Sequence, residues 1–436
     1  MKTNQQNSRW LRTVTFFLVL SLSFSTLNVS LSTQHAYAVP VVNVTTFAGT
    51  NSVGYMDGQA ASAQFNYPHD IAFDTMGTMY VADTSNNRIR AISPSGVVST
   101  FAGSGVEGGA DGTGTSAQFN SPHSIAINPT NGMMYVTEAS LTNNTPRVRA
   151  ITPSGVVTTL AGSGLTGFAN GTGTAAQFFF PTGIAVNATT GIIYVADSYA
   201  HSIRAITPSG VVTTLAGSAS IAAIIAALNG GYADGTGTNA QFSYPQGMDV
   251  DGSGTIYVTE FGGHRIRTIT PTGIVSTLAG TGVAGYTDGP GAAAQFNHPS
   301  GVVVDSVGTV YIADSSNNRI RAISPAGIVS TLAGTGAAGF VDGAGDIAQL
   351  NTPTGLVFNS AGLLYITDTY NQLIRRMTII DPVITPSASV IPGAPNTGVK
   401  SEPYKQPLLG ATGIFLAILF TLFFAYRVSK QLRKQK

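Results

Sequence analysis

Four short segments decide the fold: PHDIAFD at 68–74, MYVAD at 79–83, NNRIRAI at 86–92 and GVVSTFAG at 96–103. Each is rich in β-branched, aromatic or other apolar residues, and Asp, Asn, Ser, Pro and Gly separate one segment from the next. This is the pattern of short β-strands joined by tight turns. The stretch therefore predicts a unit of four antiparallel strands.

The same unit occurs six times along the chain. A Gln-Phe pair, or Gln-Leu in the last copy, precedes each unit, and a proline follows three residues after the Phe or Leu. The glutamines of these pairs are Gln64, Gln118, Gln177, Gln241, Gln295 and Gln349. Four strands per repeat, at intervals of 54 to 64 residues, predict the blades of a β-propeller.

The chain also carries the strand that closes the ring. The outer-strand sequence of each unit occurs once more before the first unit, at 44–49, and is missing after the last unit, which ends at Ile380. We therefore expect the N-terminal strand to complete the sixth blade, which leaves no open sheet edge. The prediction is an all-β fold, a six-bladed β-propeller over residues 39–380.

The blade pattern resembles the NHL repeat. That repeat has a Pro-x-Gly-Ile-Ala-Val-Asp strand, a Tyr-Val-Ala-Asp strand and an Asn-Asn-Arg-Ile-Arg segment, and the resemblance covers residues 41–380. It implies the six-bladed fold but no single activity, because propellers support both binding and catalysis.

The two ends of the chain predict export and attachment. Residues 1–38 have a basic start, an apolar stretch and small residues at 36 and 38, as a signal peptide does; an uncleaved membrane anchor is the alternative. Residues 408–426 are an uncharged apolar run long enough for a transmembrane helix, and the basic tail 427–436 favours a cytoplasmic C-terminus.

Residues 381–407 are rich in Pro, Ser and Gly and predict a stalk. Within it, Pro395, Thr397 and Gly398 resemble a sortase sorting motif, although Ala394 stands where that motif has leucine. The expected location is the extracellular face of the cell membrane, with a single pass. Attachment to a cell wall is the alternative.

Composition excludes several classes of protein. The chain has no cysteine, which rules out disulfide scaffolds, thiolate metal sites and cysteine nucleophiles. Residues 41–380 hold no lysine and eleven arginines against fifteen aspartates and three glutamates, a net charge of −7. This balance argues against a nucleic-acid partner and suits cations, basic peptides or neutral glycans.

Features present in every blade are most simply requirements of the blade. An acid ends the second strand six times, at Asp83, Glu138, Asp197, Glu260, Asp314 and Asp368, and an arginine recurs in the third strand, at Arg90, Arg149, Arg204, Arg267, Arg321 and Arg375. We expect structural salt bridges rather than ligand contacts. The Asp-Gly turns, such as Asp57, favour turn chemistry; calcium stays open there, although each loop offers only one carboxylate.

The position after the repeated proline differs between blades. It is occupied by His69, His123, Thr182, Gln246, Ser300 and Thr354. The innermost strand of each blade starts here, so these polar side chains are expected to surround one mouth of the central channel and to bind a ligand. Neighbouring blades supply His69 and His123, which predicts that the two imidazoles stand close enough to share a metal such as zinc.

The segments around His69 and His123 also resemble two of the three Pro-His segments that hold zinc in peptidylglycine amidating lyase. The third histidine is absent, and a catalytic zinc site usually has three protein ligands; water or Gln246 would have to complete it. His201 and His264 are interpreted as turn residues, and His298, which precedes its proline, as a loop residue. The apolar insertion at 220–228 is either a helix packed on the ring or a contact patch for a partner.

Two functions follow from these patterns. The first is a surface-displayed, monomeric ectodomain that binds or adheres to an extracellular protein or glycan and needs no cofactor. The alternative is a metal-dependent lyase or hydrolase with its site at the channel mouth.

Overall fold

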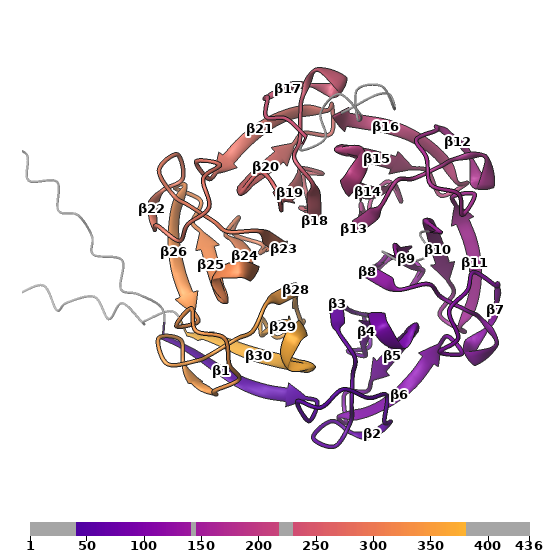
Figure 1. Ribbon diagram of the computed structural model, residues 1–436, viewed down its shortest axis with the longest axis horizontal. Helices are drawn as coiled ribbons and strands as arrows, with labels where there is room; N and C mark the ends of the chain where they lie inside the picture. The colour runs from indigo at the N-terminus through magenta and orange to yellow at the C-terminus, as the bar shows by residue number, and fades with distance from the viewer. Residues whose placement is uncertain (1–40, 141–144, 218–229, 381–436) are drawn as a thin grey trace, which may run out of the picture. The chain divides into compact units, whose positions relative to one another are not determined.

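The structure, a computed structural model, describes residues 41–140, 145–217 and 230–380. In these residues thirty strands form six antiparallel sheets of five strands each. The sheets are arranged radially around a central channel, as Figure 1 shows. The predicted six-bladed β-propeller is confirmed.

Within each blade the strands follow one another outward from the channel in the same order. Blade 1 is β3 (Pro68–Phe73), β4 (Met79–Asp83), β5 (Arg88–Ile92), β6 (Val97–Ala102) and β2 (Gly58–Gln59). Blade 2 is β8 (Pro122–Ile127), β9 (Met134–Glu138), β10 (Arg147–Ile151), β11 (Val156–Ala161) and β7 (Gly112–Thr113). Blade 3 is β13 (Pro181–Val186), β14 (Ile193–Asp197), β15 (Ser202–Ile206), β16 (Val211–Gly217) and β12 (Gly171–Thr172).

The second half of the ring repeats this order. Blade 4 is β18 (Pro245–Val250), β19 (Ile256–Glu260), β20 (Arg265–Ile269), β21 (Ile274–Ala279) and β17 (Gly235–Thr236). Blade 5 is β23 (Pro299–Val304), β24 (Val310–Asp314), β25 (Arg319–Ile323), β26 (Ile328–Ala333) and β22 (Gly289–Pro290). Blade 6 is β28 (Pro353–Phe358), β29 (Leu364–Asp368), β30 (Leu373–Ile380), β1 (Val41–Ala48) and β27 (Gly343–Ala344).

The fifth strand of each blade was not predicted. It is only two residues long and belongs to the connection that leads from the preceding blade, so in blade 1 Gly58 pairs with Val98 of β6. A two-residue strand has too little sequence to show the alternation that identifies a strand. Its effect is to cover part of the outer edge of each sheet, which would otherwise be open.

The predicted ring closure is confirmed. Strand β1 pairs antiparallel with β30, in a register that matches Val41 with Ile380 and Thr46 with Arg375. The first and last strands of the described chain therefore belong to one sheet. Because that sheet completes the ring, residues 39–380 contain every strand of the closed propeller.

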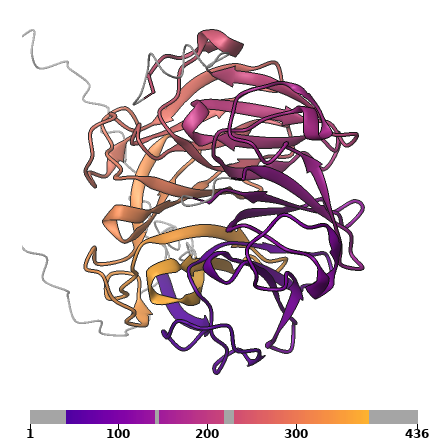
Figure 2. The same cartoon turned by 45° about the vertical axis from the view of Figure 1, so that its right-hand side comes forward.

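The hydrophobic core is divided among the six junctions between blades. At each junction, buried side chains of two neighbouring blades form one cluster. The Phe or Leu of each repeated Gln-Phe or Gln-Leu pair is buried there, at Phe65, Phe119, Phe178, Phe242, Phe296 and Leu350. This explains why the pair recurs, and the turned view in Figure 2 shows the blades lying face to face.

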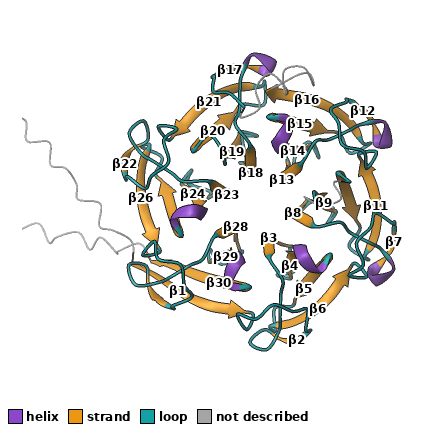
Figure 3. Cartoon of the chain, in the orientation of Figure 1, coloured by secondary structure: helices purple, strands orange, loops and turns teal. Residues whose placement is uncertain are grey.

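Helical structure in the described residues is limited to short turns. Those between the second and third strands are η1 (Thr84–Asn86), η4 (Ser198–Ala200), η6 (Ser315–Asn317) and η7 (Thr369–Asn371), and those that precede inner strands are η2 (Gly114–Ser116), η3 (Gly173–Ala175) and η5 (Gly237–Asn239). Figure 3 shows the first group beside the inner strands and the second group at the outer rim of the ring.

None of the helices in the described ranges is long and apolar enough to cross a membrane. The predicted signal peptide, stalk, sorting-like motif, transmembrane helix and tail lie outside the described residues, as does the insertion at 220–228. They remain predictions.

Candidate functional site

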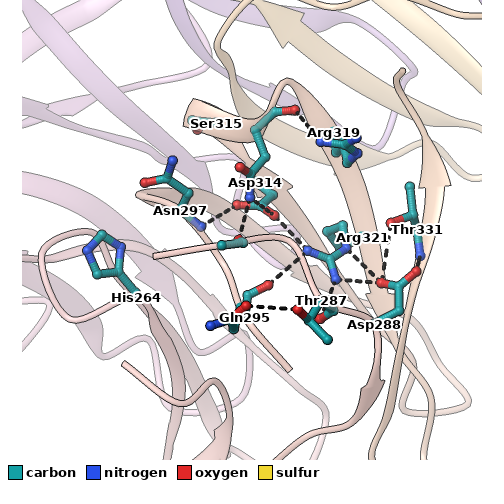
Figure 4. Close-up of polar contacts among 12 residues, drawn as sticks. His264, Thr287, Asp288, Gln295, Asn297, Asp314, Ser315, Arg319, Arg321 and Thr331 are labelled. Carbon is teal, nitrogen blue, oxygen red and sulfur yellow. Dashed lines mark hydrogen bonds and ion pairs between the residues drawn. The ribbon is translucent and has the colours of Figure 1, made fainter. Parts of the chain in front are cut away.

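The recurring acid and arginine form a buried ion pair in every blade, as predicted. The Nη1 of Arg321 lies 2.7 Å from Oδ2 of Asp314, and neither side chain is exposed to solvent. The other five blades repeat this pair. Figure 4 shows that Arg321 also reaches the carbonyl oxygens of Gln295 and Thr287, which ties the incoming connection to the blade.

The aspartates of the Asp-Gly turns are partners of the same arginines. Asp57, Asp111, Asp234, Asp288 and Asp342 each pair with the second terminal nitrogen of the arginine in their blade. In blade 3 Asn170 accepts the equivalent hydrogen bond from Arg204 at 2.8 Å. Most carboxylates of the acidic propeller thus lie beside buried cations, so its negative charge is not concentrated on an open face.

A cavity of about 220 Å³ occupies the centre of the ring. The inner strands line it, from their first residues to their last. We call the end of the ring where these strands begin the mouth face. Five of the six residues predicted at the mouth are among the cavity lining: His69, His123, Gln246, Ser300 and Thr354.

Two of the six predicted residues form side-chain hydrogen bonds across the junctions between blades, and a third is buried. Thr182 is not part of the cavity lining; it is 3% exposed, and its hydroxyl donates to the Pro245 carbonyl of the next blade. The Thr354 hydroxyl donates in the same way to the carbonyl of His69, at 2.6 Å. Ser300 is also buried. His69, His123 and Gln246 are the members that keep partly exposed side chains at the cavity.

The two histidines are in direct contact. The ring centroids of His69 and His123 are 3.6 Å apart, with an angle of 41° between the ring planes. Burial lowers the pKa of His69 to about 4. Burial and the neighbouring His69 lower the pKa of His123 well below its usual value. Both imidazoles are therefore neutral at pH 7 and can donate and accept hydrogen bonds.

Asp70 joins blades 1 and 2 beside this pair. Its Oδ2 accepts hydrogen bonds from the Ser124 hydroxyl and from the Ile125 amide at 3.1 Å, and its Oδ1 accepts from the Ile71 amide at 2.9 Å. Burial raises the pKa of Asp70 to about 6, against the lowering effect of these three hydrogen bonds.

The other four blades have glycine at the position of Asp70 and Ser124. A Cβ atom on Gly183 would collide with the carbonyl oxygen of Gln246 in the next blade, and Gly247, Gly301 and Gly355 also meet the next blade closely. Blades 3 to 6 thus start their inner strands in close contact with their neighbours. Blades 1 and 2 instead place side chains between strands, so the ring is asymmetric where the histidines lie.

Sequence reasoning missed Asp249. Four residues after the repeated proline, five blades have Ala or Val, and blade 4 has this aspartate. Its oxygens accept hydrogen bonds from the Val250 and Val304 amides, both at 2.8 Å, and burial raises its pKa to about 6. Comparison of the six copies at this position would have identified it.

A row of aromatic rings at the mouth face was also missed. His123 lies edge-on to Phe180 at 6.5 Å, Phe180 stacks on Tyr199 at 4.6 Å, and Tyr199 meets Tyr244 edge-on at 5.5 Å. We call His69, His123, Phe180, Tyr199 and Tyr244 the aromatic crescent; it runs from blade 1 to blade 4. At the position of each of these residues, some other blades carry small or polar residues. The aromatic crescent can therefore be recognised in the sequence only when the six copies are aligned with one another.

His201 and His264 are turn residues, as predicted. His201 and His264 have left-handed backbones, with φ of 49° and 51°. Their Nδ1 atoms accept the amide hydrogens of Tyr244 and His298 in the next blade, at 3.2 and 3.1 Å. Asn87 and Asn318 do the same with their side-chain oxygens. The residue at this turn position thus links two neighbouring blades by one hydrogen bond, and we call this link a staple.

A metal would find only part of a ligand set at the mouth. The buried Nδ1 of His123 has no hydrogen-bond partner among the described residues, and His69 lies against it. Across the residues that the structure describes, however, no three His, Asp or Glu side chains are grouped as metal ligands. Two imidazoles would need Gln246 or water to complete a site.

Fold and channel together define the class of protein: a six-bladed β-propeller with a cavity at its centre. The NHL repeat family matches five segments, at 65–92, 178–206, 242–269, 296–323 and 350–377. The chain therefore belongs to the NHL-repeat β-propeller proteins, and the structure adds blade 2 as the sixth repeat.

Curated relatives share the propeller region. The chain is 32% identical over 278 residues to Protein SUPPRESSOR OF QUENCHING 1, chloroplastic, of Arabidopsis thaliana, covering 62% of this chain and 26% of that protein. It is 30% identical over 307 residues to NHL repeat-containing protein 2 of Gallus gallus, covering 64% and 41%. The chain thus spans less than half the length of these relatives.

Solved structures share the fold. A protein of unknown function from Bacteroides thetaiotaomicron superposes with a TM-score of 0.60 at 22% identity, covering 78% of this chain and 76% of the other. An auxiliary nutrient binding protein of the same organism gives 0.59 at 19% identity, covering 78% and 77%. Neither comparison extends beyond the fold, and the resemblance to peptidylglycine amidating lyase is not shown.

Proposed function

We propose that the propeller is a binding module, displayed on the cell surface, which holds an extracellular protein or glycan at its mouth face. One observation carries the proposal: the aromatic crescent begins at His69 and His123 in the cavity lining, where Gln246 also lies, and continues through Phe180 along the mouth face. Apolar rings with a few convergent polar groups are typical of ligand sites. A relative in fold named as an auxiliary nutrient binding protein agrees with such a role.

Display at the surface rests on the sequence alone. The predicted signal peptide and apolar segment 408–426 would place the propeller on the extracellular side, with the stalk 381–407 as a spacer. Attachment to a wall through Pro395, Thr397 and Gly398 is an alternative. The module is proposed to act as a monomer and without nucleic acid.

The test uses residues 39–380, which contain the whole ring. The labelled fragment is applied to one array of neutral and acidic oligosaccharides and one array of extended peptides. We expect binding on one of them that a Gln246→Ala variant loses. Met76→Ala is the matched control, since Met76 is 81% exposed on a turn at the opposite end of the ring. Absence of binding on both arrays, or equal loss in both variants, would contradict the proposal.

A second candidate is a metal site at the mouth, favoured by the contact between His69 and His123. The two imidazoles would hold a zinc ion that supplies Lewis-acid chemistry for a lyase or hydrolase. Metal content of the fragment, purified without chelator or nickel resin, tests it. About one zinc per chain, lost when both histidines are changed to alanine, supports this candidate; no metal after zinc is added back rejects it.

A further inference from the structure

The mouth face has the chemistry of a site for an uncharged ligand. Among the described residues, no arginine or lysine lines the cavity. Its two acids, Asp70 and Asp249, use their oxygens to accept backbone amides of their own and the next blade. The two histidines are neutral at pH 7. An anionic ligand would meet no positively charged side chain in this lining. A cationic ligand would have to compete with the backbone amides that already donate to Asp70 and Asp249.

The polar groups that remain at the mouth suit hydroxyl groups. His69 and His123 each carry one donor and one acceptor when neutral. The Gln246 side chain lines the cavity, and no residue that the structure describes is hydrogen-bonded to its amide. The His69 ring uses one nitrogen for the backbone carbonyl of His123, and the His123 ring contacts the backbone carbonyl of Thr182 and has a buried Nδ1. The Gln246 amide and the other nitrogen of His69 are therefore the groups that can donate to and accept from the hydroxyl groups of a ligand.

The aromatic crescent adds flat apolar surface beside these groups. Tyr199 is 38% exposed although it stacks on Phe180 and touches Tyr244. The face of an aromatic ring is the negative pole of its quadrupole, so it attracts the weakly positive C–H groups on the face of a sugar ring. Ring and hydroxyl-binding groups lie next to each other at the contact between His123 and Phe180.

The size of the cavity limits how much of a ligand can enter. Pockets that enclose drug-sized ligands begin at about 300 Å³, and this cavity is about 220 Å³. One small unit fits, and the rest of a longer ligand must lie outside. A chain that inserts only its last unit and lays the next along the aromatic crescent satisfies both conditions.

We infer that the mouth face binds the end of a neutral saccharide chain. The terminal sugar hydrogen-bonds to His69 and Gln246, and the following unit packs on Tyr199. This inference rests on the proposed binding function and names the ligand class for the same site.

Isothermal titration of residues 39–380 with soluble neutral hexasaccharides tests the inference; the probes are maltohexaose, cellohexaose and chitohexaose, with a hexamer of galacturonic acid as the acidic counterpart. We expect one neutral hexamer to bind and the acidic one not to bind. Tyr199→Ala should weaken the binding about tenfold or more, as truncation of an aromatic anchor does.

Three variants keep the test decisive. Tyr199→Phe retains the ring and should retain binding, Gln246→Ala should weaken it, and Met76→Ala should leave it unchanged. Saccharide binding that survives both Tyr199→Ala and Gln246→Ala overturns the site. If only peptides bind, and Gln246→Ala abolishes that binding, the saccharide class is wrong while the binding function stands. If neither saccharides nor peptides bind, both the saccharide inference and the proposed binding function are wrong.

Discussion

Six arginines without solvent exposure are the most unusual residues of this propeller. Each is held by a buried acid on one terminal nitrogen, and five have a half-exposed aspartate on the other. Taking such charges out of water costs several kcal/mol per ion, which the acids and the backbone carbonyls bound to the two terminal nitrogens offset. The arginine therefore acts as a connector whose partners come from three parts of the blade.

Removal of the arginine should be far more damaging than removal of its exposed partner. Arg321→Met leaves the Asp314 carboxylate buried and unpaired, which we expect to destabilise the protein by about 3–5 kcal/mol. Asp288→Asn recreates the arrangement that Asn170 already makes in blade 3 and should cost about 1 kcal/mol or less. Denaturant midpoints of residues 39–380 measure both; equal losses would show that the buried pair has no special weight.

The histidine staples predict a pH dependence. Burial lowers the pKa of both His201 and His264 from the usual 6.5, and His298 and Arg265 add to this at His264. The folded protein therefore favours the neutral imidazoles. Their contribution to the free energy of unfolding is complete above pH 6.5 and is lost as the pH falls through the pKa values of the folded state.

Asparagine should remove that dependence without breaking the staple. In His201→Asn with His264→Asn, the amide oxygen accepts the same backbone hydrogen, as Asn87 and Asn318 do. We expect melting temperatures close to wild type at pH 7 and higher than wild type at pH 5. The reverse change, Asn87→His, should steepen the loss at low pH. Parallel pH profiles for all three proteins would exclude the staple as its cause.

At the scale of elements, the starts of the inner strands decide how tightly neighbouring blades approach. Four blades use glycine there because atoms of the next blade occupy the place of a Cβ atom. Blades 1 and 2 use Asp70 and Ser124 and form hydrogen bonds between strands instead. The proposed site therefore lies in the part of the ring where this close contact is replaced by side chains.

Gly301→Ala tests this packing. Its Cβ atom would collide with the carbonyl oxygen of Thr354, and since backbone cannot move as a side chain does, we expect a loss of about 1–3 kcal/mol. Gly252→Ala is the control, because nothing lies within 4 Å of a Cβ atom there. Thermal unfolding of the two variants compares them directly, and similar melting temperatures would refute the collision.

Strand β1 should be required for the ring. A fragment that begins at Thr50 lacks it and leaves the whole edge of β30 unpaired, an edge that can pair with another chain. We expect this fragment to melt at lower temperature and to form dimers or aggregates in gel filtration, while residues 39–380 stay monomeric. A monomeric, equally stable truncated fragment would mean that closure contributes little.

For the whole molecule, the sequence predicts architecture better than site. Six copies of a strand-and-turn pattern determine the blades, and the displaced outer strand at 44–49 determines how the ring closes. The ion pairs were also predictable, because an acid and an arginine occupy the same two positions in all six copies. The direction of a side chain was not: Thr182 and Thr354 share the position of His69 yet turn to the neighbouring blade.

Features that occur once in the ring were the hardest to foresee. Asp249 occurs in one blade and the residues of the aromatic crescent in only some of the blades, and their neighbours come from other blades, far away in the sequence. A pattern along one strand cannot show which rings meet across a junction between blades. Alignment of the six copies with each other, position by position, shows where to look.

The pairing of Val41 with Ile380 has a mechanical consequence. Since the first and last strands run antiparallel and their outer ends lie side by side, opposite pulls on the two ends would open the seam one residue pair at a time, as a zipper opens. Such peeling needs far less force than sliding all pairs at once. Attachment through the predicted C-terminal segment alone would keep this seam out of the direct path of tension.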